Sequence, residues 1–219
     1  MYHIKSKNCK IIVSADVNCL NKLWKIIENI GDKISILKIH YDIIEDFTTN
    51  ITYTINRINY YKNKYRFYVW EDRKFADIGF IMKRQIKCHV DKWADIVSVH
   101  PIAGLDSVRE LSFIKVILIG EMSSTGALTN EEYKINVKNI AEQLPNVIGI
   151  VCQSKMSDTK FNIVPGISKI DKKTDNMGQQ YNDPSARSFA DFFVVGRDIL
   201  RSENPRKKLL EYMESTLNI

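Results

Sequence analysis

The chain contains eight short apolar runs, and these runs constrain its fold more than any other feature of the sequence. They are rich in β-branched residues and nearly continuous, which is typical of parallel strands buried on both faces. Segments with helical periodicity separate most of them. We therefore expect eight strands, within residues 10–16, 35–40, 66–74, 94–100, 116–122, 146–152, 161–167 and 192–198.

Two of the intervening segments carry clear helix signals. Residues 19–31 end at Gly31, a residue type favoured at helix C-caps, and residues 129–144 begin with Thr129 and Glu132 at capping-box spacing. Apolar residues recur at helical spacing in both segments: Leu20, Leu23, Trp24, Ile27 and Ile30 in the first, and Tyr133, Val137, Ile140, Ala141 and Leu144 in the second. Less regular patterns predict helices at 47–64, 79–92, 184–190 and 203–216. The gap between the sixth and seventh strands is too short for a full helix.

Eight strands that alternate with helices in 219 residues fit either a (β/α)8 barrel or a doubly wound open sheet. The strand count favours the barrel. No G-x-G-x-x-G follows the first strand, which weakens the case for a dinucleotide-binding sheet. We expect an α/β protein with one (β/α)8 TIM-barrel domain over residues 1–219.

The net charge of +6 is compatible with nucleic acid, an anionic membrane or an anionic small molecule as the partner. The lysines are scattered without an RNP-type motif or a basic helix, so we expect no nucleic acid. No apolar run approaches the ~20 residues of a membrane helix, and the first residues carry no signal-peptide pattern. We expect a cytoplasmic protein without a membrane partner. The cysteines and histidines lack metal-ligand spacing, so we expect no metal.

Polar residues gather where the predicted strands end, which is where barrel enzymes carry their chemistry. Asp72 and Lys74 are two apart in a strand and share a side, whereas Arg73 points away. Lys38 ends the preceding strand, and Asp77 follows in the next loop. Alternating signs would let all four groups of this Lys–Asp–Lys–Asp array stay ionised. Spacing alone leaves two interpretations open, a stabilising ion-pair network and a catalytic site.

The segment "EDRKFADIG" at residues 71–79 resembles the signature of the orotidine 5′-phosphate decarboxylase family in its eukaryotic form. Other segments resemble the family in the family's order: "SADV" at 14–17, "LKIH" at 37–40, "GEMSSTGAL" at 120–128, "VPGI" at 164–167, "DNMGQQYNDP" at 175–184 and "VVGRDIL" at 194–200. The resemblance implies a (β/α)8 barrel that acts as a homodimer. It also implies decarboxylation of orotidine 5′-monophosphate to uridine 5′-monophosphate without a cofactor. No phosphoribosyltransferase domain is present, so a single-function chain is expected.

The resemblance also implies roles for individual residues. Asp72 would lie beside the scissile carboxylate, and Lys74 would protonate C6 after carbon dioxide leaves. Lys38 would hold both of them and touch the ribose, and Asp77 would complete the array in the partner subunit's site. The implied substrate-binding residues are Asp16 for a ribose hydroxyl, Ser123 for the pyrimidine, Pro165 for the closing loop, and Gln179, Tyr181, Gly196 and Arg197 for the phosphate.

One departure from the family keeps an alternative open. The family usually continues with Asn-Thr after "DIG", and that threonine contributes a hydroxyl to the partner's site, but Phe80 and Ile81 stand here. The alternative is a non-catalytic barrel that binds uridylate. A related barrel enzyme that acts on a sugar phosphate with a metal fits less well, because Lys38 and the "SST" and "GQQY" segments are of the uridylate type.

Overall fold

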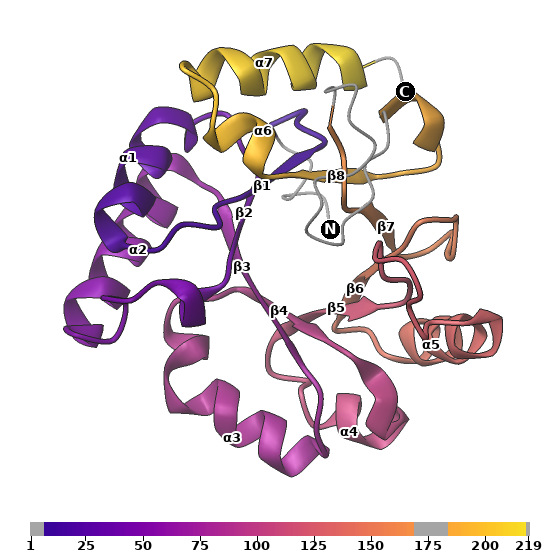
Figure 1. Ribbon diagram of the computed structural model, residues 1–219. Coiled ribbons are helices and arrows are strands. Elements are labelled where there is room, and N and C mark those ends of the chain that lie inside the picture. Colours follow the sequence, from indigo (N-terminus) through magenta and orange to yellow (C-terminus); the bar gives the residue numbers. More distant parts are fainter. Residues whose placement is uncertain (1–6, 169–183, 218–219) are drawn as a thin grey trace.

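The computed structural model describes residues 7–168 and 184–217, and in these ranges eight parallel strands close into a barrel in chain order (Figure 1). Strand β1 pairs with both β2 and β8, which closes the ring. The predicted (β/α)8 barrel is confirmed, and each predicted apolar run overlaps one strand. The strands are β1 (Ile11–Ser14), β2 (Ile36–Ile39), β3 (Tyr68–Phe75), β4 (Ile96–Val99), β5 (Lys115–Ile119), β6 (Val147–Val151), β7 (Phe161–Val164) and β8 (Phe192–Val195).

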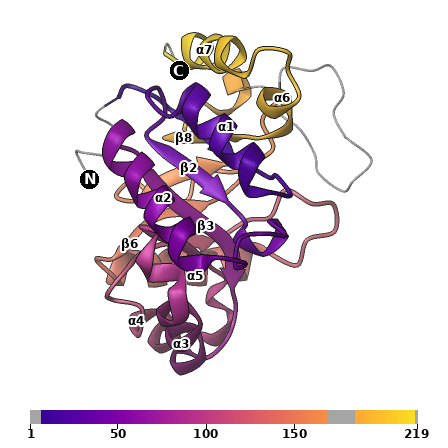
Figure 2. The ribbon, with the colours of Figure 1, turned by 90° about the vertical axis from the view of Figure 1, so that its left-hand side faces the viewer.

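Helices surround this barrel, and Figure 2 shows α1 and α2 along the outside of β2 and β3. The α-helices are α1 (Leu20–Ile30), α2 (Ile51–Tyr65), α3 (Gly79–His89), α4 (Leu105–Arg109), α5 (Glu131–Gln143), α6 (Arg197–Leu200) and α7 (Pro205–Thr216). Short 3-10 helices are η1 (Tyr41–Ile43), η2 (Val90–Lys92), η3 (Pro101–Ala103) and η4 (Pro184–Arg187). None of the helices in the described ranges is long and apolar enough to span a membrane.

One helix start differs from the prediction, and one helix end agrees with it. Helix α5 begins after Asn130, whose side chain accepts a hydrogen bond from the Tyr133 N–H, so the predicted capping box at Thr129 is wrong. The Thr129 hydroxyl instead accepts from the Met122 N–H. Gly31 does follow α1, but with a right-handed backbone of φ −58°. A side chain there would meet the Tyr65 ring and the Ile27 carbonyl oxygen at 2.6 Å, so close packing requires the glycine.

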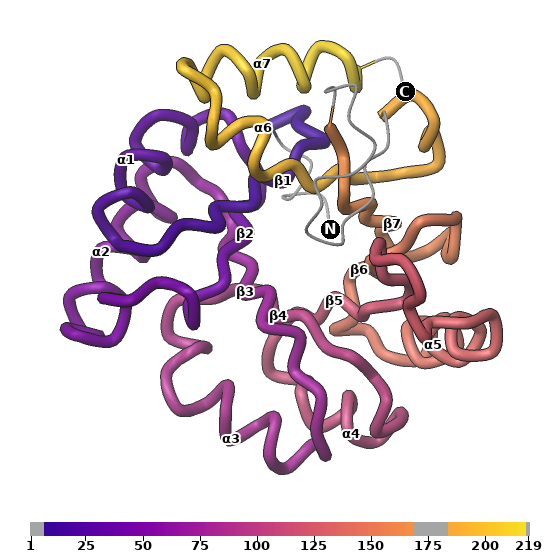
Figure 3. The backbone as a smooth tube through the Cα atoms, in the orientation of Figure 1, coloured from indigo at the N-terminus to yellow at the C-terminus, as the bar shows by residue number. Residues whose placement is uncertain are grey.

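Buried apolar side chains form two layers because successive strand residues point to opposite faces. Inward-pointing residues such as Ile36 and Trp70 fill the barrel, and outward-pointing ones pack against the helices. The backbone trace in Figure 3 shows this ring of strands inside the ring of helices. Two residues beyond Ile36 and Trp70, the same strands present Lys38 and Asp72 at the carboxyl end of the barrel. They lie above the apolar side chains that fill the barrel, which we call the apolar plug.

The connection between β6 and β7 contains no helix, as its short length predicted. The buried Asn162 side chain holds this connection in place. Its amide oxygen accepts from the N–H groups of Met156 and Ser157 at 2.9 and 3.1 Å, and its amide nitrogen donates to the Ser157 carbonyl oxygen at 2.8 Å. These hydrogen bonds satisfy backbone groups that a helix would otherwise satisfy internally.

The Lys7 ammonium lies at the amino-terminal end of the barrel, opposite the end that carries Lys38 and Asp72. There it contacts two helix–strand connections. It donates to the carbonyl oxygens of Gly31 and Ile34 at 3.0 and 2.8 Å, and also to that of Tyr65. Gly31 and Tyr65 lie at the ends of α1 and α2, so the cation meets the negative ends of two helix dipoles.

Candidate active site

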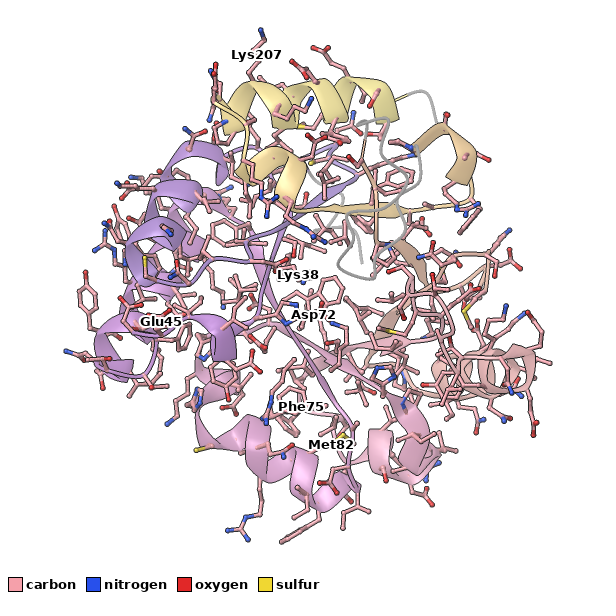
Figure 4. The ribbon with its side chains drawn as sticks, viewed as in Figure 1. Lys38, Glu45, Asp72, Phe75, Met82 and Lys207 are labelled. Atoms are coloured by element: carbon pink, nitrogen blue, oxygen red, sulfur yellow. The ribbon has the colours of Figure 1, made fainter. Side chains whose placement is uncertain are left out.

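A cavity of about 240 Å³ lies at the carboxyl end of the barrel. In Figure 4, Lys38 and Asp72 lie near the centre of the molecule, whereas Lys207 projects from α7 at its edge. Trp70 contributes to the lining, which connects the cavity with the apolar plug below. Eight of the eleven predicted site residues line the cavity: Asp16, Lys38, Asp72, Lys74, Ser123, Pro165, Gly196 and Arg197.

Asp72 forms the centre of the charged array. One of its oxygens, Oδ2, lies 2.9 Å from Nζ of Lys38 and 2.9 Å from Nζ of Lys74. Asp72 and Lys38 are only 5% and 6% exposed. Burial alone would favour the neutral acid, but the two lysines hold the pKa of Asp72 well below its ordinary value. The carboxylate is therefore ionised although it is buried.

The same pairing keeps Lys38 charged. Burial tends to lower the pKa of Lys38, and the charges of Asp72 and Asp16 more than offset it, so the pKa lies above the ordinary value. Asp16 lies 3.6 Å from the Lys38 ammonium and accepts a hydrogen bond from the Ser14 hydroxyl at 2.8 Å. Burial alone would raise the pKa of Asp16, but the Lys38 charge and the Ser14 hydrogen bond act against it, and the pKa lies below its ordinary value. This carboxylate is therefore ionised as well.

His40 is a further member of the site, and in the sequence it stood out only as the last residue of the "LKIH" segment. Its Nε2 lies 2.8 Å from the Lys38 ammonium, which donates to it, and 3.4 Å from Asp72. Burial and the nearby Lys38 charge lower the pKa of His40 to about 4. The ring is therefore neutral at neutral pH and serves as an acceptor for Lys38 without adding a positive charge.

The backbone of Lys74 is unusual. Its φ is +60°, a left-handed conformation that costs a residue with a β-carbon about 1–2 kcal/mol. The pairing of β3 with β4 is irregular here: Glu71 pairs with Val97 and Phe75 with Val99, so β3 has three residues between these pairs where β4 has one. The Lys74 N–H is directed to the Ser98 hydroxyl at 3.0 Å, and that hydroxyl donates to Asp72 Oδ1 at 2.7 Å.

The charges on either side of Asp72 have other roles. Arg73 points away from the cavity, as its spacing predicted, and its guanidinium lies 4.0 Å from Asp42. Glu71 also points outward but is fully buried, with Oε2 accepting the Tyr41 N–H at 3.0 Å. The run of four charges thus divides into two inward groups that form the site and two outward groups that do not.

Glu121 is a second residue that sequence reasoning did not assign to the site. It follows β5, lines the cavity, and accepts hydrogen bonds from the N–H groups of Gln153 and Ser154 at 2.9 and 3.0 Å. It therefore fixes the start of the β6–β7 connection against the segment that carries Ser123. The signal for it was its place inside "GEMSS", two residues before the assigned Ser123.

One predicted site residue, Asp77, is described by the structure but does not line the cavity. Asp77 is exposed, and its carboxylate accepts the N–H of Ile78 at 2.7 Å. Beside it, Ile78 and Phe80 are 58% and 60% exposed. Gln179 and Tyr181 lie outside the described residues.

One group of side chains in the described ranges is close enough to hold a metal ion, namely His40, Asp42 and Glu71, with ligand atoms within 4.8 Å of one another. Two of its members already have partners: Lys38 donates to His40, and the Tyr41 N–H to Glu71. Burial raises the pKa of Glu71 to about 8, so it is a neutral acid at neutral pH, and neutral acids bind metals poorly. This donor set does not favour a cation.

Comparison with known proteins identifies the relatives of this barrel. Residues 9–212 match the model of the orotidine 5′-phosphate decarboxylase / HUMPS family. The chain belongs to this family. An orotidine 5′-phosphate decarboxylase from Rhizopus oryzae is 34% identical over 90% of this chain and 79% of its own length, and one from Aureobasidium pullulans is 32% identical over 95% and 82%.

The uridine 5′-monophosphate synthase of Bos taurus is 32% identical over 92% of this chain, but the match covers 44% of that protein. The chain therefore spans less than half of this relative and about four fifths of the two fungal decarboxylases. The family membership confirms the resemblance inferred from "EDRKFADIG" and the other ordered segments.

Proposed function

We propose that this chain decarboxylates orotidine 5′-monophosphate to uridine 5′-monophosphate. The observation that carries the proposal is the pairing of Asp72 with Lys38 and Lys74, each at 2.9 Å, on the floor of the cavity. Family membership supports the same reaction. An ion-pair network that only stabilises the fold would not require a cavity beside its charged groups, whereas a catalytic site does.

The reaction requires a group that can stabilise and then protonate a carbanion. When the bond between C6 and the carboxylate carbon breaks, carbon dioxide leaves and the electron pair remains on C6. The Lys74 ammonium stabilises this negative charge and transfers a proton to C6, which gives the product. Asp72, ionised beside the departing carboxylate, holds Lys74 in place through their 2.9 Å contact.

Binding groups line the rest of the cavity. We assign the ribose hydroxyls to Asp16 and Lys38 and the pyrimidine edge to Ser123. Arg197 and the backbone of Gly196 are assigned to the phosphate, with Pro165 at the start of the closing segment. The phosphate is remote from the reacting bond, so its binding energy can serve to order and desolvate the site.

The array is completed by a second copy of the chain in this proposal. Asp77 is exposed and lies beside the exposed Ile78 and Phe80, which offer an apolar contact next to the carboxylate. In a two-fold symmetric dimer each chain would give its Asp77 to the other chain's site. Phe80 supplies packing where the family usually supplies polar groups, so we expect the departure to alter the contact without removing the charge array.

The loss of orotidylate absorbance with purified protein tests the proposed reaction. We expect turnover by the wild type, a loss of roughly 10⁴-fold or more in Lys74→Ala, and no change in Lys207→Ala, the matched control at the exposed edge of α7. A folded wild-type protein that binds uridylate by calorimetry but gives no turnover above buffer would support the non-catalytic alternative instead.

Mixing two inactive variants tests the shared site. Lys74→Ala and Asp77→Ala each damage every site in their own homodimers. A mixed dimer contains one intact site, with Lys74 from one chain and Asp77 from the other. Equal mixing with free exchange should therefore restore about a quarter of wild-type activity by random pairing. Activity that stays at the level of the separate variants, with exchange shown by mass spectrometry, would contradict the shared site.

A further inference from the structure

We propose that Ser98 is a positioning residue, which holds Asp72 and Lys74 in the geometry that the proposed decarboxylation needs. Ser98 lies on β4 and is 0% exposed, so it does not reach the substrate cavity. Its hydroxyl donates to Asp72 Oδ1 at 2.7 Å and accepts the Lys74 N–H at 3.0 Å. One hydroxyl group therefore contacts both reacting residues.

The contact with Lys74 compensates for a break in the sheet. Between the Glu71–Val97 and Phe75–Val99 pairs, β3 carries two more residues than β4, so regular backbone pairing is lost in this stretch. A backbone N–H that is shielded from water and lacks an acceptor is unfavourable. The Ser98 hydroxyl accepts the Lys74 N–H, and so helps to keep Lys74 at its left-handed φ of +60°.

That backbone conformation matters for the direction of the side chain. From it the Lys74 ammonium reaches both Oδ2 and the backbone oxygen of Asp72, at 2.9 and 3.2 Å, while still lining the cavity. A relaxed, extended Lys74 would change the direction of its Cα–Cβ bond. Loss of the Ser98 acceptor would thus misdirect the proton donor without removing it.

The contact with Asp72 fixes the other member of the pair. Both lysines contact Oδ2, and Ser98 contacts Oδ1, so the two carboxylate oxygens have different partners. This division prevents the carboxylate plane from rotating. It also leaves Oδ2 for the lysines while a neutral donor satisfies the buried Oδ1.

Ser98→Ala tests the proposal by steady-state kinetics, with Ser35→Ala as the matched control. Ser35 is also buried, near the amino-terminal end of β2, and among the described residues its hydroxyl has no hydrogen-bond partner. We expect Ser98→Ala to lower kcat about 10–100-fold, because small misplacements of reacting groups are costly, with KM within about threefold of the wild type. Ser35→Ala should leave both constants unchanged.

Further variants separate positioning from folding. Ser98→Thr retains a hydroxyl and should recover much of the lost kcat, whereas Ser98→Cys preserves volume with a weak donor and should not. Near-ultraviolet circular dichroism identifies variants that fail to fold, and Ser98→Cys then replaces Ser98→Ala in the comparison. A folded Ser98→Ala or Ser98→Cys with kcat within twofold of the wild type would overturn the proposal. A change confined to KM would do the same, because it would indicate a role in binding.

The wild-type assay keeps this proposal distinct from the proposed function. An inactive wild type would reject the decarboxylation itself. The crystal structure of Ser98→Ala would then decide the positioning role: it predicts loss of the positive φ at Lys74, and retention of that φ together with the 2.9 Å contact to Asp72 would count against it.

Discussion

Glu71 gives the sharpest test of the electrostatics of β3, because among the described residues no cationic group is in direct contact with its buried side chain. Its side chain is 0% exposed, Oε2 accepts the Tyr41 N–H, and Oε1 has no partner among the described residues. Burial raises its pKa from 4.5 to about 8, with the charges of Asp42 and Asp72 adding to the effect. The folded protein therefore holds a proton that the unfolded chain releases at lower pH.

The sign and the size of the effect follow from linkage. A raised pKa in the folded state contributes stability in full below pH 4.5, and this contribution is lost as the pH rises toward 8. The two pKa values differ by about 3.5, which at 1.36 kcal/mol each corresponds to about 5 kcal/mol above pH 8 and about 3 kcal/mol at pH 7. Glu71→Gln has the shape of the neutral acid but does not titrate. We therefore expect it to equal the wild type in stability near pH 4.5 and to exceed it increasingly up to pH 8.

Urea unfolding at fixed protein concentration between pH 4.5 and 8 measures this difference. Glu45→Gln, the same change at an exposed position in the η1–α2 connection, is the control for the substitution itself (Figure 4). If Glu71→Gln is no more stable than the wild type at pH 8, Glu71 is ionised in the folded protein and the reasoning from burial is wrong.

Three further predictions concern stability, measured by calorimetry, where each kcal/mol shifts Tm by about 2–4 °C in a chain of this size. Lys7→Met removes the donor to three carbonyl groups and should cost about 1–3 kcal/mol while kcat is unchanged, since Lys7 is at the end opposite the site; a fall in kcat of the folded variant would contradict this. Asn162→Ala leaves two N–H groups without an acceptor and should cost about 3 kcal/mol. Asn162→Asp should be intermediate in stability, because its oxygens still accept. A Tm of Asn162→Ala equal to that of the wild type would refute this prediction. Gly79→Ala places a methyl group 2.8 Å from the Ser107 carbonyl oxygen and should cost about 1–3 kcal/mol. An unchanged Tm would contradict this prediction, because it would show that α4 can move to accommodate the methyl group.

The sequence predicts the strands well because each strand of this barrel is buried on both faces. Continuous apolar runs are the direct consequence of that environment, and all eight were recognisable. Helix starts were less predictable, because neighbouring residues compete for the cap. Thr129 and Asn130 can both act as caps, and the choice depends on the Met122 N–H, which engages Thr129 from across the loop.

The spacing of residues within one strand predicted only part of the site. The period of two placed Asp72 and Lys74 on one side of β3, which the structure confirms. The same rule could not show that Lys74 has a left-handed backbone, since that depends on the offset between β3 and β4. Nor could it identify Ser98 as the shared partner, because a serine within an apolar strand reads as an ordinary core residue.

Pairing also explains how the buried charges of Lys38 and Asp72 are maintained. In the described cavity, two ammonium groups, Lys38 and Lys74, face Asp72 and the more exposed Asp16, while His40 stays neutral. A buried charge is tolerable when it is paired, so this balanced set can be assembled before the substrate arrives. In the proposed reaction the substrate carboxylate brings one further negative charge, and the carbanion left on C6 carries that same charge after carbon dioxide departs. The negative charge near the Lys74 ammonium therefore keeps its size and moves by about one bond length. The site needs little reorganisation to stabilise this charge in its new position.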